Sequence, residues 1–128
     1  MVIKGILDYG ETLITPGLNL LYGPGNDLVS TTAMAAAGAQ IILFTTGRGT
    51  PFGAPVPTVK ISTNTELYKK KSNWMDFNAG EIATGRSIDE VASDFMTYIE
   101  GVISGEQLTL TEINNYREIA IFKNGITL

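Results

Sequence analysis

The 128-residue sequence contains no cysteine and no histidine. Without cysteine no disulfide can form, so a reducing cytoplasm is the expected compartment. Imidazole and thiolate, two common metal ligands, are both missing. Catalysis by a histidine general base is excluded as well.

Long apolar runs and an excess of basic charge are also missing. No apolar stretch approaches the roughly 18 residues that a membrane-spanning helix needs, and the first residues do not resemble a signal peptide. The net charge is −4, and the only basic cluster, Lys69 to Lys71, is expected to be a solvated helix surface. The sequence therefore predicts a cytoplasmic protein that binds neither nucleic acid nor a membrane.

The composition, 44% hydrophobic and 17% charged, is typical of one globular domain covering residues 1–128. Apolar runs and helix-like segments alternate along it. Strands are expected at residues 2–7, 18–22, 40–46, 58–62 and 119–122, and helices at residues 28–37 and 88–104. A further short helix, capped by Asn64 or Thr65, is expected to run through Lys71.

Capping patterns support these helices. Asp27 is expected to cap the first helix, and Ser87 with Glu90 has capping-box spacing at the start of the last. Residues 108–115 fit neither helix nor strand clearly, and residues 124–125 are a turn signal.

The run at residues 40–46 is almost continuously apolar, which is typical of a central parallel strand buried on both faces. A strand, a helix and a strand in succession form one right-handed crossover unit. The predicted fold is therefore α/β, a three-layer Rossmann-like domain with a mostly parallel sheet and flanking helices.

This apolar run leads directly into a glycine-rich loop. Arg48 stands there between Gly47 and Gly49 and is the only basic residue between Lys4 and Lys60. Open α/β sheets bind ligands at the carboxyl ends of their strands, and a guanidinium can fork onto a carboxylate or phosphate. The loop is therefore either an anion cradle or a turn whose arginine pairs with a neighbouring acid. No Gly-Lys-Ser/Thr follows, so it is not a phosphate P-loop.

Other polar residues follow other expected strands. They either cap the next helix or, if the strands are parallel neighbours, share a rim with the arginine. The candidate substrate-binding residues are Asp27, Thr45, Thr46, Gly47, Arg48, Gly49, Asn64 and Thr65.

Asp76, Asn78 and Glu81 could in principle hold a hard cation such as Mg²⁺. The apolar residues Trp74 and Phe77 beside them favour core packing instead. We therefore predict no metal site in this sequence.

Three blocks of the sequence carry a family resemblance. The first comprises residues 45–49, 52–53, 57–60 and 63–65; the second, residues 75–82; the third, residues 24–27 with 30–32. In this order and spacing they resemble the C-terminal domain of the altronate/galactarate dehydratase (altronate hydrolase) family. The chain departs from the family at Asn26, where an aromatic residue is usual.

The resemblance implies that this domain belongs to a larger sugar-acid dehydratase, which removes water from altronate or galactarate to give a 2-keto-3-deoxy acid. It implies a divalent metal, iron or similar, for the full enzyme, held with most catalytic groups by the remainder of the chain. Arg48, the threonines and the glycine backbone would hold a substrate carboxylate, and Asn64 and Thr65 would hold hydroxyls. No cofactor and no turnover are expected of this chain alone.

Two other functions remain open. The domain could be a non-catalytic scaffold whose glycine loop is a contact in a homo-oligomer. A free-standing nucleotide or phosphate binder would fit the fold, but the sequence carries no specific fingerprint for one.

Overall fold

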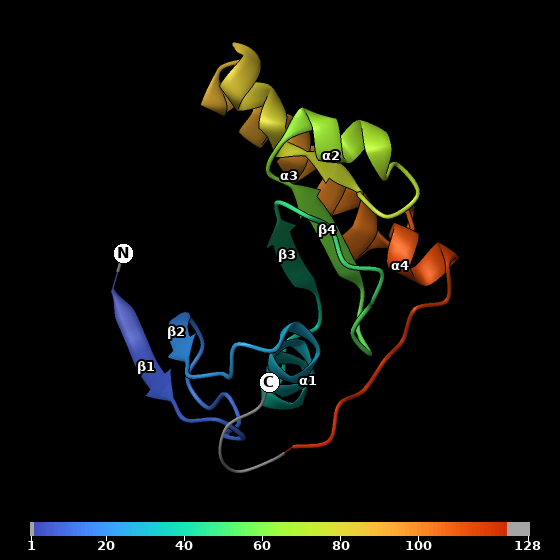
Figure 1. The fold of residues 1–128 in the computed structure, drawn as a ribbon. Coiled ribbons are helices and arrows are strands. Elements are labelled where there is room, and N and C mark those ends of the chain that lie inside the picture. Colours follow the sequence, from blue (N-terminus) through green and yellow to red (C-terminus); the bar gives the residue numbers. More distant parts are fainter. Residues whose placement is uncertain (1, 123–128) are drawn as a thin grey trace.

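A computed structural model describes residues 2–122 of the chain (Figure 1). The elements in chain order are β1 (Ile3–Leu7), β2 (Leu18–Leu21), α1 (Asp27–Ala37), β3 (Ile42–Thr46), β4 (Thr58–Ser62), α2 (Thr65–Lys70), β5 (Phe77–Asn78), the 3₁₀ helix η1 (Ala79–Thr84), α3 (Ile88–Ser104) and α4 (Leu110–Ile113). Among the described residues, no helix is long and apolar enough to cross a membrane.

The strands form two small parallel sheets. β1 pairs with β2, and β3, β4 and β5 pair in that order. The α/β class, with parallel strands and flanking helices, is therefore confirmed. A three-layer Rossmann-like arrangement stays a prediction, because these strands are divided between two sheets rather than joined in one.

β4, not β3, is the central strand of the larger sheet. β3 lies on one side of β4 and β5 on the other, and all five residues of β4 are buried. Among residues 2–122, β3 pairs with β4 alone, and Leu43 is 48% exposed. The prediction that residues 40–46 form a central strand buried on both faces is wrong. The strand has a neighbour on one edge only in the described part of the chain, and Leu43 leaves one of its faces exposed.

The first helix begins one residue earlier than expected. The side chain of Asn26, not Asp27, is the cap and accepts a hydrogen bond from the N–H of Val29 at 3.2 Å. Asp27 is instead the first helical residue, where its negative charge faces the positive end of the helix dipole. Gly38 ends the helix in the left-handed conformation, as its place in the sequence indicates.

Helix α3 is confirmed at both ends, with the Ser87–Glu90 capping box at its start and Gly105 after its end. Its inner face supplies Ile99 and Val102 to the main apolar cluster, where they pack against Val59 and Ile61 of β4. α3 therefore covers one face of the larger sheet.

The end of the described chain is irregular. The ambiguous segment 108–115 contains the short helix α4, capped by Thr109 and Glu112. Residues 119–122 form no strand: the N–H of Ala120 donates to the hydroxyl of Thr32 in α1 instead of to a sheet neighbour. The turn expected at residues 124–125 lies outside the described residues.

Candidate functional site

The loop after β3 is a tight turn organised by one threonine. The Oγ1 atom of Thr46 accepts hydrogen bonds from the N–H of Arg48 at 3.3 Å and of Gly49 at 2.9 Å. Gly49 has a φ of 77°, a conformation that favours glycine. The N–H of Gly49, which we expected to face an anion together with that of Gly47, already has an acceptor in this structure.

Helix α2 fixes the same loop from the other side. The amide of Asn64 accepts from the N–H of Leu67 at 2.8 Å, as the helix cap, and donates to the carbonyl of Gly47 at 3.2 Å. The Nζ of Lys71 donates to the carbonyl of Arg48 at 2.8 Å. The loop is thus held through its backbone by both ends of α2.

Arg48 itself keeps its side chain free. Its guanidinium is exposed and forms no ion pair or hydrogen bond with any residue from 2 to 122. The interpretation in which Arg48 pairs with an acidic neighbour is therefore wrong for the described chain. A fixed loop that presents an unpaired guanidinium can bind an anion with little loss of backbone entropy.

The other candidate residues lie at different distances from the loop that carries Arg48. Thr45 is exposed one residue before Thr46, whereas the hydroxyl of Thr65 exchanges hydrogen bonds with the side chain of Asn78. Asp27 lies at the exposed start of α1, which Figure 1 shows below the larger sheet, whereas the loop after β3 lies at its top. The structure brings together Thr46, Arg48 and Asn64 but not Asp27.

The acidic group around β5, comprising Asp76, Asn78 and Glu81, does not fit a metal. The Oδ1 of Asp76 accepts hydrogen bonds from the hydroxyl of Tyr98 and the N–H of Leu110, and its Oδ2 accepts from the N–H of Lys60. Burial raises the pKa of Asp76, and these hydrogen bonds oppose that rise. Among residues 2–122, no three side chains of aspartate or glutamate lie close enough together to hold a metal ion. The divalent metal that the family resemblance implies for the full enzyme is therefore not assigned to these residues.

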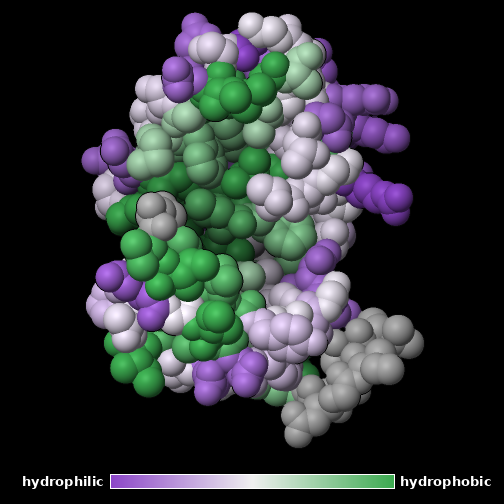
Figure 2. All heavy atoms as spheres, turned by 90° about the vertical axis from the view of Figure 1, so that its left-hand side faces the viewer, coloured by the Kyte–Doolittle hydropathy of each residue, from purple (hydrophilic) through white to green (hydrophobic). Residues whose placement is uncertain are grey.

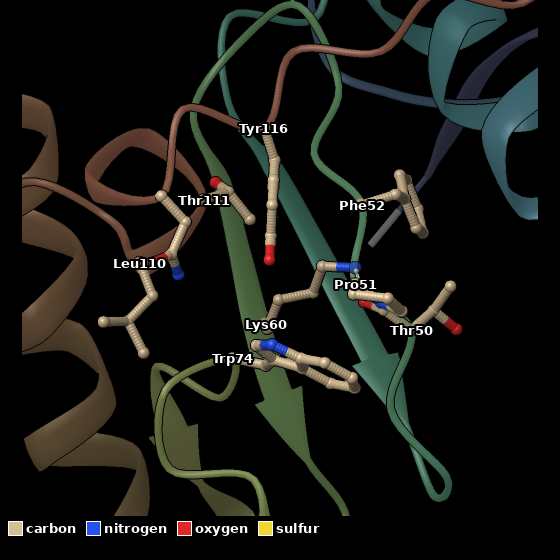
Figure 3. A pocket seen from close by; sticks show the side chains of 9 residues that line it. Thr50, Pro51, Phe52, Lys60, Trp74, Leu110, Thr111 and Tyr116 are labelled. Carbon is tan, nitrogen blue, oxygen red and sulfur yellow. Dashed lines mark hydrogen bonds between the residues drawn. The ribbon is translucent and has the colours of Figure 1, made fainter.

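Lys60 is a buried cation that the sequence did not single out. Its side chain leaves β4 and extends toward residues 50–52, with Tyr116 and Trp74 on either side (Figure 3). The Nζ donates to the carbonyl of Thr50 at 3.0 Å and lies 3.7 Å from the centre of the Phe52 ring and 4.3 Å from that of Phe44. Both ring faces attract the positive charge.

The burial of Lys60, which is 1% exposed, has an electrostatic cost. Desolvation lowers the pKa of its ammonium group from 10.5 to about 8, and the carboxylates of Asp27, Asp76 and Glu118 act in the opposite direction. No described carboxylate forms an ion pair with it. Lys60 thus titrates closer to neutrality than an ordinary lysine does.

Two of these roles, those of Lys71 and Lys60, are not predicted by the sequence. Lys71 was expected to be one of three solvated lysines, but it ties α2 to the loop and its Nζ also lies 4.7 Å from the centre of the Trp74 ring. Lys60 alternates with Val59 and Ile61, as in a half-exposed strand. Its burial depends on Phe44 and Phe52, which only the folded chain brings to it.

Comparison with known proteins identifies the domain to which this geometry belongs. The family model described as "D-galactarate/Altronate dehydratase, C-terminal" matches residues 1–127. The chain belongs to this family. It is 52% identical over 127 residues to the altronate dehydratase of Escherichia coli (strain K12), covering 99% of this chain and 26% of that protein.

Two further relatives agree. The altronate dehydratase of Bacillus subtilis (strain 168) is 56% identical over 127 residues, with 98% of this chain and 25% of that protein covered. The galactarate dehydratase (L-threo-forming) of E. coli K12 is 38% identical over 123 residues, with 94% and 24% covered. The chain thus spans about a quarter of the length of these curated relatives. The family model that it matches describes the C-terminal part of such dehydratases.

Proposed function

We propose that this chain is the C-terminal domain of a sugar-acid dehydratase acting on altronate or galactarate, and that Arg48 binds a carboxylate of the substrate. The observation that carries the proposal is the exposed, unpaired guanidinium of Arg48 on a loop fixed by Thr46, Asn64 and Lys71. The names of the relatives supply the substrate class, since both altronate and galactarate carry carboxylates.

The other contacts follow from what the loop leaves available. Thr45, which is exposed one residue before Thr46, would bind the same ligand through its hydroxyl. Asn64 and Thr65 would have to exchange their present hydrogen bonds to reach a substrate hydroxyl, so their first role is to position the loop. The base, the acid and the divalent metal of the dehydration belong, in this proposal, to the remainder of the dehydratase chain.

The decisive experiment is the Arg48→Ala substitution in the full-length dehydratase, with altronate and galactarate as substrates. Loss of a charged contact that forms with the substrate should lower kcat/KM about a hundredfold, equivalent to about 2.7 kcal/mol. Arg48→Lys keeps the positive charge but cannot form two parallel hydrogen bonds to a carboxylate, so we expect an intermediate decrease in kcat/KM. Arg117→Ala, at another exposed arginine, is the matched control.

Unchanged kinetics in Arg48→Ala would contradict the substrate-binding role. The alternative function, a scaffold or assembly domain, is favoured by the extensive exposed apolar surface of this chain. It predicts that the same substitution leaves KM unaltered and changes the oligomer size, which light scattering would detect.

A further inference from the structure

One side of the molecule is largely apolar. Figure 2 shows hydrophobic side chains gathered over this side, with a hollow between an upper and a lower group. Exposed residues of this kind come from α3 and η1 as well as from β1 and β2, among them Ile88, Ile82, Ile6 and Leu20. A monomeric soluble domain rarely exposes so extended an apolar surface.

Three separate hollows are each lined by exposed apolar side chains. One, of about 200 Å³, lies between η1 and α3 and is lined by Ile82 and Phe95. A second, of about 270 Å³, is lined by Ile41 and Ile103, and a third, of about 290 Å³, adjoins β2 and includes Met34. None of the residues lining the three hollows is charged. We call these hollows, together with the exposed apolar residues beside them, the apolar face.

Both sheets have strand edges without a neighbour in the described part of the chain. Within residues 2–122, β2 pairs only with β1 and β3 pairs only with β4, so each has an edge with no neighbour. The apolar sequence of β3 is typical of a strand covered on both faces, yet Leu43 is half exposed. The composition of β3 thus fits a covered environment that the described residues do not supply.

We propose that the apolar face is the surface on which the remainder of the dehydratase chain packs. This inference rests on the proposed function, because it takes the chain to be one domain of a longer dehydratase. The length of the relatives favours the remainder of the chain as the occupant of this face. The curated relatives are about four times as long as this chain and match nearly all of its residues, so most of their length lies outside this domain. A covalently linked neighbour also has a high effective concentration at the face.

Two methionines report on this contact in the full-length dehydratase. Met34 lines one hollow and is 42% exposed. Met96 of α3 is 55% exposed and lies one helical turn after Ala92, which lines the hollow between η1 and α3. Met75, in contrast, is buried in the core. We expect hydrogen peroxide to oxidise Met34 and Met96 at least tenfold more slowly in the native full-length protein than after unfolding. Met75, which is buried within the domain itself, should be protected in the same way and serves as the reference. Rates for Met34 and Met96 close to those of the unfolded chain would overturn the proposal.

Dilution distinguishes the remainder of the same chain from a second copy. Protection that persists at concentrations where the full-length protein is monomeric supports the proposal. Protection lost as a dimer dissociates overturns it, since the face would then be an interface between copies.

A charged residue on the face should loosen the contact. Ile103→Asp in the full-length protein should speed the oxidation of Met96 at least fivefold, because Ile103 is 69% exposed in this domain and loses little packing within it. Ile113→Asp is the matched control, since Ile113 of α4 is similarly exposed and lines none of the three hollows. Equal oxidation of Met96 in the two variants would contradict the proposal.

The two proposals fail separately. Arg48→Ala with unchanged kinetics would remove the substrate-binding role but leave the protection of Met34 and Met96 intact. If Met34 and Met96 oxidise rapidly in an enzyme whose activity falls with Arg48→Ala, only the proposal that the apolar face is a packing surface is contradicted.

Discussion

The carboxylate of Asp76 accepts a hydrogen bond from the backbone N–H of Lys60 at 2.7 Å. The N–H of Asp76 in turn donates to the carbonyl of Lys60 at 2.9 Å. With its second carboxylate oxygen, Asp76 also binds the hydroxyl of Tyr98 in α3 and the N–H of Leu110 in α4. One side chain thus joins the central strand to two helices.

Removal of this carboxylate should destabilise the domain strongly. Asp76→Ala leaves three donors without their acceptor, and each unsatisfied buried group costs about 1–3 kcal/mol, so we expect a loss of at least about 3 kcal/mol in the free energy of unfolding. Tyr98→Phe removes one of the three donors and should cost about 1 kcal/mol. Denaturant unfolding measures both. A loss below that of Tyr98→Phe in Asp76→Ala would contradict the assigned role.

Lys60 should make stability depend on alkaline pH. In the unfolded chain its ammonium keeps the proton up to a pKa of 10.5, whereas in the fold it releases it near a pKa of about 8. Between these values the folded state binds fewer protons, so this group raises the free energy of unfolding with pH, by at most about 1.4 kcal/mol per unit. Below pH 8 the cost of the buried charge is fully present.

The contribution is isolated by comparing the wild type with Lys60→Met. The stability of the wild type relative to this variant should stay level from pH 6 to about 7.5 and increase from about pH 8 to 10.5. Lys69→Met, at an exposed lysine, controls for the loss of one positive charge. A difference that stays constant over the whole range would show that the pKa of Lys60 is not lowered.

Gly80 should tolerate no side chain. A Cβ atom there would lie 2.3 Å from the N atom of Thr65 and 2.5 Å from the Cα of Asn64, both backbone atoms of the α2 start. Gly80→Ala should therefore cost more than about 2 kcal/mol, because the backbone must move. Gly25→Ala is the matched control, since a Cβ at Gly25 meets nothing within 4 Å and should change stability by less than about 1 kcal/mol.

Asn64 should determine how rigidly the loop presents Arg48. Asn64→Ser retains a side-chain oxygen that can cap α2, but it cannot reproduce the hydrogen bond that the longer amide donates to the carbonyl of Gly47. We expect faster hydrogen exchange at the N–H of Gly49 with little loss of overall stability. Asn64→Ala also loses the cap and should cost about 1 kcal/mol. Unchanged exchange at Gly49 in both variants would show that Asn64 does not hold the loop.

The sequence predicted well those features that depend on neighbours along the chain. The Ser87–Glu90 capping box and the final Gly105 located α3 to the residue. At α1 the same reasoning chose Asp27 over Asn26, although both residue types are good caps; in the structure Asn26 has the extended backbone of a cap and Asp27 is already helical.

Features that depend on distant contacts could not be predicted in this way. Whether the apolar residues 42–46 form a central or an edge strand depends on which strands pair with them, and no local pattern encodes that. The loop around Arg48 was located, but the hydrogen bonds that occupy its N–H groups and carbonyls come partly from α2. Lys60 is buried because Phe44 and Phe52 converge on it from outside β4.

Residues 118–120, which follow α4, form hydrogen bonds with much earlier parts of the chain, and this affects the order in which the chain folds. The N–H of Gly53 donates to the carboxylate of Glu118, 65 residues further on, and the hydroxyl of Thr32 accepts from the N–H of Ala120, 88 residues further on. During synthesis, the helix α1 and the loop at Gly53 therefore leave the ribosome long before these partners exist. Contacts of such sequence separation form slowly, so this domain completes its packing only after most of its chain has emerged.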